Sequence, residues 1–207
     1  MLSAFAIALP AVLFIVDPIG VVPIFVALTG NDTKERCAAI ARRSTVVAGG
    51  LLVAFALFGT VIFNVFSVTL AAFRVAGGLL LMLTALDMLR AQHPGTKTTA
   101  RETDEAQDQT EVAIVPIAIP LLSGPGAIAT VMVLMAQLGG GLNAAIPVIS
   151  SIVITMLLSY LLLSHAHAVK RVLRQSGIAI LERVFGLILA AIAVQFVFDG
   201  GKELLKG

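Results

Sequence analysis

The feature that most constrains this chain is a succession of long apolar runs. A helix needs about 20 consecutive apolar residues to cross the hydrocarbon core of a bilayer. Six such runs follow one another, at Leu2–Leu28, Ser44–Phe66, Leu70–Leu89, Val112–Leu138, Ala144–Ser164 and Ile178–Phe198. Since backbone polar groups inside lipid must be paired within the protein, the runs predict an all-α polytopic membrane protein with six transmembrane helices.

The composition agrees with this class and excludes others. Hydrophobic residues make up 58% of the 207 residues and charged residues only 13%, against about 45–50% and about 25% in soluble domains. Such sparse charge argues against a nucleic-acid partner and favours membrane lipid and a small-molecule substrate as partners. The single cysteine, Cys37, excludes an intrachain disulfide and a cysteine-based metal site, and we expect neither a metal nor a cofactor.

The basic residues predict how the chain is oriented in the membrane. Ten of the 14 Lys and Arg residues fall in segments 29–43, 90–111 and 165–177, whereas segments 67–69 and 139–143 contain none. Short connections rich in Lys and Arg stay in the cytoplasm. The alternation therefore predicts six spans with both termini outside.

The chain divides into two halves of three spans each. Residues 91–111 are polar and charged, and they are predicted to form a cytoplasmic linker between a first three-helix repeat, 1–90, and a second, 112–207. Because each half has an odd number of spans, the second half must enter the membrane from the opposite side. Inverted-topology repeats of this kind are typical of secondary transporters, although channels contain them too.

Short motifs recur in the two halves in the same order. Residues 16–20 (VDPIG) correspond to residues 123–127 (SGPGA), and residues 74–77 (RVAG) correspond to residues 183–186 (RVFG). The first pair places a proline beside small residues in mid-span, where proline interrupts a helix. The first and fourth helices are therefore predicted to be broken near the midplane, as at transporter binding sites. The alternative is a proline kink without a ligand role. The candidate substrate- or ion-binding residues are Asp17, Pro18, Gly20, Pro23, Ser123, Gly124, Pro125 and Gly126.

Asp17 is the most informative side chain, because it lies in mid-span with no Lys or Arg in the same run. A charge at that depth costs about 2.5–3.5 kcal/mol on insertion scales. Asp17 is therefore a candidate proton carrier, or a counter-ion for a substrate ammonium or Na⁺. Alternatively it is the N-cap of the half-helix that it precedes, and the two roles are compatible.

Other polar residues in or near the spans are weaker candidates. Arg74 and Arg183 begin their spans, so they either snorkel to an interface or form gate contacts. Asn64, Thr130 and Gln195 either make interhelical hydrogen bonds or support the binding site.

Four stretches of the chain resemble the MarC family, also called UPF0056 or the SnatA-like neutral amino-acid transporter family. They are residues 16–25 (VDPIGVVPIF), 73–80 (FRVAGGLL), 120–128 (PLLSGPGAI) and 186–196 (GLILAAIAVQF). The resemblance implies a six-span protein of the bacterial inner membrane. It also implies transport of small neutral amino acids such as glycine and alanine, with proton coupling. Relatives commonly have Asn where this chain has Val21, which puts identical specificity in doubt.

These observations together predict a secondary transporter of small neutral solutes coupled to H⁺ or Na⁺. The alternatives are a channel or lipid-handling protein without ion coupling, and a non-transporting regulatory membrane protein. We expect no enzymatic activity, because no histidine falls within a span to activate a serine such as Ser123. Gly49-Gly50 and Gly77-Gly78 permit close helix packing within one subunit or between subunits. A homo-oligomer is therefore compatible with the sequence.

Overall fold

The computed structural model describes residues 2–30, 32–90 and 122–205, and all regular structure in these ranges is helical. The predicted linker 91–111 and the first part of the predicted fourth span lie outside the described residues. The helices are α1 (Leu2–Val16), α2 (Pro18–Leu28), α3 (Lys34–Phe66), α4 (Leu70–Leu89), α7 (Pro125–Gln137), α8 (Gly141–Ser164) and α9 (Ala166–Leu204). The prediction of an all-α fold is confirmed.

Five helical segments are long and apolar enough to cross a bilayer. They are Leu2–Val26, Lys34–Gly59, Leu70–Leu89, Gly141–Ser164 and Ala179–Leu204. They correspond to five of the six predicted spans. The described part of the fourth predicted span forms the shorter apolar helix α7, of 13 residues. The chain is thus a multi-pass α-helical membrane protein, while the count of six spans stays a prediction.

Two helices extend well beyond the spans expected from hydropathy. Helix α3 begins at Lys34 rather than at Ser44, and α9 begins at Ala166, so the predicted connections 29–43 and 165–177 are largely helical. Hydropathy marks where lipid ends, not where the helix ends. Lys, Arg, Glu, Gln and Ala are strong helix formers, so helix continues through the polar residues that flank the membrane.

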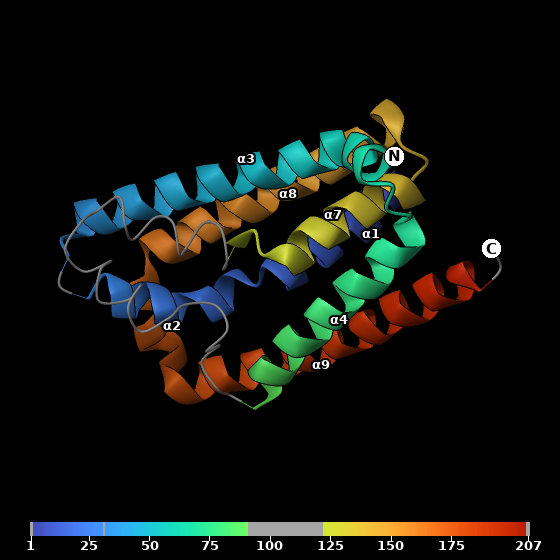
Figure 1. Ribbon diagram of the computed structural model, residues 1–207. Helices are drawn as coiled ribbons and strands as arrows, with labels where there is room; N and C mark the ends of the chain where they lie inside the picture. Colours follow the sequence, from blue (N-terminus) through green and yellow to red (C-terminus); the bar gives the residue numbers. More distant parts are fainter. Residues whose placement is uncertain (1, 31, 91–121, 206–207) are drawn as a thin grey trace.

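The helices pack in two outer pairs around a central layer. Helix α3 packs against α8 and α4 packs against α9, while α1, α2 and α7 lie between the pairs (Figure 1). The connections alternate between the two ends of the molecule. The α2–α3 and α8–α9 junctions and the end of α4 lie at one end, and the α3–α4 connection lies at the other, with the start of α1 and the end of α9.

Glycines allow the α4–α9 pair to pack closely. A Cβ at Gly78 would lie 2.8 Å from the carbonyl oxygen of Ala193, and one at Gly186 would lie 3.1 Å from the carbonyl oxygen of Ala85. Each helix thus presents a glycine to the other, so the glycine contacts at Gly78 and Gly186 lie within one subunit. Pairing of α3 with α8 and of α4 with α9 is also what an inverted repeat predicts, although the repeat itself stays a prediction.

Large side chains fill the interior, and the outer surface is also apolar. Phe25 of α2, Leu52 of α3 and Ile152 of α8 are fully buried, and α8 packs against both α2 and α3. Exposed large hydrophobic residues occur on the outer sides of the long helices, for example Val46, Phe58, Leu83, Leu157 and Leu187. A continuous apolar exterior is unfavourable in water but matches the lipid that surrounds a multi-pass membrane protein.

Candidate functional site

The first predicted helix break occurs at Asp17. Helix α1 ends at Val16 and α2 begins at Pro18, and Asp17 between them has a left-handed backbone with φ 45° and ψ 64°. The backbone N–H of Gly20 donates a hydrogen bond to Oδ1 of Asp17 over 3.1 Å. Asp17 therefore caps α2, as the N-cap interpretation predicted, and it lies at the junction of two half-helices inside one membrane-spanning run.

The break is narrower than the sequence suggested. Helix α2 runs without interruption from Pro18 to Leu28 and contains the candidate residues Gly20 and Pro23, so the interruption is confined to Asp17. Gly20 instead accommodates the cap. A Cβ at this position would collide with Oδ2 of Asp17 and would lie 2.9 Å from its Cγ. The glycine is thus required by the aspartate three residues earlier.

The second predicted break occurs before α7. Ser123 is buried, and Gly124 is the N-cap of α7 with an extended backbone, φ −61° and ψ 168°. Pro125 takes the first helical position, where its missing N–H costs nothing. Gly124 has no side chain with which to cap this helix, so the N–H groups of Gly126 and Ala127 lie at its positive end, an arrangement that favours an anion.

Close packing fixes the start of α7 against α4. A Cβ at Gly126 would lie 2.5 Å from Cδ2 of Leu81, and one at Gly77 would lie 2.6 Å from the Cβ of Ala129. The Thr130 hydroxyl donates to the carbonyl oxygen of Gly126 over 2.9 Å. Thr130 thus bonds to the backbone of its own helix rather than across to another helix.

Helix α8 adds buried hydroxyl groups that the sequence analysis missed. Ser151, Thr155 and Ser159 are fully buried and four residues apart, so they form one column along the helix. Ser151 donates to the carbonyl oxygen of Pro147 and Ser159 to that of Thr155. The Thr155 hydroxyl has no hydrogen-bond partner among the described residues. The i, i+4 spacing of Ser and Thr in an apolar run was the available signal.

The two breaks and the hydroxyl column lie at similar depths. Counted from the end that holds the start of α1, Asp17 lies about 22 Å along α1 and Thr155 about 21 Å along α8 at 1.5 Å per residue. Gly124 lies about 20 Å from the end of α7 by the same measure. Helices α1, α7 and α8 contact one another. The candidate site therefore combines a carboxylate, a helix N-terminus whose N-cap is a glycine, and a hydroxyl group without a hydrogen-bond partner among the described residues.

Among the predicted gate and supporting residues, Thr130 lies on α7 at this site, whereas Arg74, Arg183 and Gln195 lie on α4 and α9. Arg74 of α4 forms an ion pair with Glu203 of α9, with 2.7 Å between Nη1 and Oε2; sequence reasoning did not single out Glu203. Arg183 is exposed, and Gln195 donates to Asp199 one turn further along α9 over 2.9 Å. The Asn64 side chain lies outside what the structure describes. Within the described ranges, no three His, Cys, Asp or Glu residues gather as a metal site would require.

Comparison with known proteins agrees with this architecture. The model of the "MarC family integral membrane protein" matches residues 2–205. The chain is 39% identical to a UPF0056 membrane protein of Methanocaldococcus jannaschii, over 96% of both chains. It is 34% identical to YvbG of Bacillus subtilis (91% of this chain, 89% of YvbG) and 30% identical to YhcE of Escherichia coli (93% and 89%), which carry the same description. No solved structure matches.

Fold, site and relatives define an integral multi-pass α-helical membrane protein with interrupted helices. The chain belongs to the MarC family, as its motifs indicated. The relatives' names give a family and a membrane location but no substrate.

Proposed function

We propose that this chain is a secondary transporter of small neutral solutes, with small amino acids such as glycine and alanine as its substrates and H⁺ as the coupling ion. One observation carries the proposal: a carboxylate, Asp17, stands in a left-handed backbone conformation between two half-helices of one membrane-spanning run. Ionisable residues inside a membrane mark ion or substrate pathways. Discontinuous helices supply the binding groups at transporter midplanes.

The proposed substrate pose follows from the charges at the two breaks. The N–H groups of Gly126 and Ala127, at the positive end of α7, receive the substrate carboxylate. The carboxylate of Asp17 receives the substrate ammonium group or the coupling proton. The Thr155 hydroxyl supplies a further hydrogen bond at the same depth.

The glycines favour a small substrate. Gly124, the N-cap of α7, has no side chain, so a ligand approaches its backbone closely, while Gly126 is packed against Leu81. The neighbouring side chains, Leu81 and Leu122, are buried and apolar. A zwitterion with a short side chain fits such surroundings better than one that carries a second charge.

The proposal includes a membrane orientation. We place the chain in the cytoplasmic membrane, with both termini outside and with the α2–α3 and α8–α9 junctions in the cytoplasm, because these junctions carry the basic residues. Its partners are then lipid and substrate. It needs neither a cofactor nor enzymatic chemistry.

Uptake into liposomes that contain the purified protein tests the proposal. Labelled glycine and alanine are offered with an imposed pH gradient, with an imposed Na⁺ gradient, and with no gradient. We expect accumulation above equilibrium only with the pH gradient, and competition by other small neutral amino acids but not by lysine or glutamate. Uptake that stops at equilibrium under every gradient contradicts coupling and favours the channel alternative. The absence of uptake for all solutes rules out the transporter proposal.

A further inference from the structure

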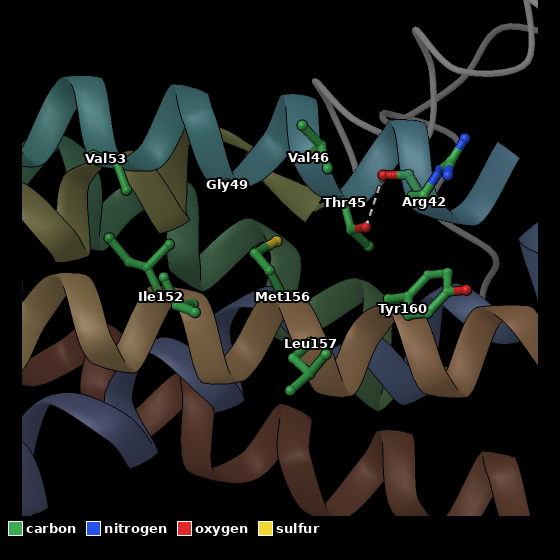
Figure 2. A pocket seen from close by; sticks show the side chains of 10 residues that line it. Arg42, Thr45, Val46, Gly49, Val53, Ile152, Met156, Leu157 and Tyr160 are labelled. Atoms are coloured by element: carbon green, nitrogen blue, oxygen red, sulfur yellow. Dashed lines mark hydrogen bonds between the residues drawn. The ribbon is translucent and has the colours of Figure 1, made fainter. Parts of the chain in front are cut away.

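A groove runs along the outer face of the α3–α8 pair, away from the candidate transport site. It encloses about 330 Å³. Val53 and Ile152 line one end of the groove, and Arg42 and Tyr160 face each other at the other end (Figure 2).

The groove is apolar along its length. Gly49 lets Met156 of α8 pack against α3, since a Cβ there would lie only 3.1 Å from Cγ of Met156. Thr45, the polar residue in its wall, donates its hydroxyl to the carbonyl oxygens of Ala41 and Arg42. The hydroxyl is therefore satisfied within α3, and hydrocarbon is the surface that remains for a ligand.

The length of the groove matches one leaflet of a membrane. Arg42 and Val53 are 11 residues apart on one helix, which corresponds to about 16 Å. Half of a bilayer's hydrocarbon core is about 15 Å thick. An acyl chain lying along the groove would thus reach from the interface, at Arg42, to the middle of the membrane.

A cavity with charged walls adjoins the Arg42 end of the groove. The cavity has a volume of about 810 Å³, lies between the start of α3 and the α8–α9 junction, and shares Tyr160 with the groove. Its charged walls contain Lys34 and Arg171 together with Asp32 and Glu35.

One of the two acids of the cavity is paired with a residue outside it. Asp32 forms an ion pair with Arg36, with 3.1 Å between Oδ1 and Nε. Glu35 is then the remaining acid beside Lys34 and Arg171 of the cavity and Arg42 of the groove, and in the part of the chain that the structure describes none of these three cations forms an ion pair. The juxtaposition of an apolar groove one leaflet long and these cations at its end matches an acyl chain joined to a phosphate.

We propose that the α3–α8 groove and the adjoining cavity form a binding site for one anionic phospholipid. An acyl chain occupies the groove between Gly49 and Leu157, and the phosphate lies near Arg42, Lys34 and Arg171. This site is separate from the proposed transport site, and the proposal does not depend on what the chain transports.

The absence of tryptophan from the chain makes the test direct. A Leu157→Trp reporter lies in the groove, whereas Leu158→Trp, one residue away and also exposed, lies outside it. Each protein is reconstituted in bilayers that contain brominated phosphatidylglycerol or brominated phosphatidylcholine, and the quenching of tryptophan fluorescence gives the relative affinity for the two lipids. We expect about a fivefold preference for phosphatidylglycerol at Leu157→Trp for each cation that contributes, and none at Leu158→Trp.

A matched pair of charge variants completes the test. Arg42→Gln and Arg43→Gln remove the same charge from adjacent exposed positions, but only Arg42 lines the groove. We expect Arg42→Gln to lower the preference about fivefold and Arg43→Gln to leave it unchanged. Lys34→Gln serves as a second variant if Arg42→Gln does not fold. An equal preference at both reporters, an equal effect of the two arginine variants, or no preference for the anionic lipid overturns the proposal.

Discussion

Substitutions at Asp17 separate its structural role from its proposed chemical role. The residue makes two local contributions: its carboxylate caps α2 and its backbone adopts φ 45°. Alanine removes the cap, which costs about 1 kcal/mol, and lacks the polar side chain whose local hydrogen bonds let Asp and Asn adopt the left-handed conformation, which otherwise costs about 1–2 kcal/mol. Asparagine keeps both features, because it is an equally good N-cap and tolerates the left-handed conformation. Glycine removes the conformational cost and loses only a few tenths of a kcal/mol as a cap.

The measurement is thermal unfolding of the purified variants in one detergent. The expected loss for Asp17→Ala is about 2–3 kcal/mol, which corresponds to a fall in Tm of about 4–12 °C for a chain of this size. Asp17→Asn should melt at or above the wild-type temperature, since it keeps the cap and removes a charge from the membrane. The Tm of Asp17→Gly should lie between those of Asp17→Ala and Asp17→Asn. An Asp17→Ala protein as stable as Asp17→Asn would refute both the cap and the left-handed conformation as stabilising features.

Two further predictions concern packing and topology. Gly77→Ala should destabilise the protein by about 1–3 kcal/mol, because the new Cβ would lie 2.6 Å from an alanine methyl group on α7. Gly50→Ala, with nothing within 4 Å of its Cβ, should stabilise it by about 0.5–1 kcal/mol; equal Tm values for the two variants would contradict the packing. In a cysteine-free background, Val68→Cys and Lys202→Cys should react with an impermeant maleimide from one side of the membrane and His167→Cys from the other. Labelling of all three from one side would disprove the alternating topology.

The local features of the site could be predicted from the sequence because short-range chemistry determines them. Asp17 was a candidate N-cap because it precedes Pro18 and a half-helix, and the residues that form the cap are neighbours in the chain. The left-handed backbone of Asp17 was not predicted. The Ser-Gly-Pro-Gly segment before α7 is interrupted for the same kind of reason. The first break is confined to Asp17, because α2 continues through Pro23.

Features that depend on distant partners could not be predicted. The ion pair of Arg74 joins residues 129 positions apart, and nothing near Arg74 in the sequence identifies Glu203. The buried hydroxyl of Thr155 becomes informative only once α8 is placed against α1 and α7. Hydropathy likewise could not locate the starts of α3 and α9, because a helix that leaves the membrane remains a helix when its residues favour that conformation.

The most direct test of the central claim compares wild type with Asp17→Asn in two transport modes. If Asp17 carries the coupling proton, Asp17→Asn retains the fold and should still exchange labelled for unlabelled substrate across liposome membranes without a gradient. It should, however, fail to accumulate substrate when a pH gradient is imposed, whereas wild type accumulates it. Gradient-driven accumulation by Asp17→Asn at the wild-type level would contradict the account.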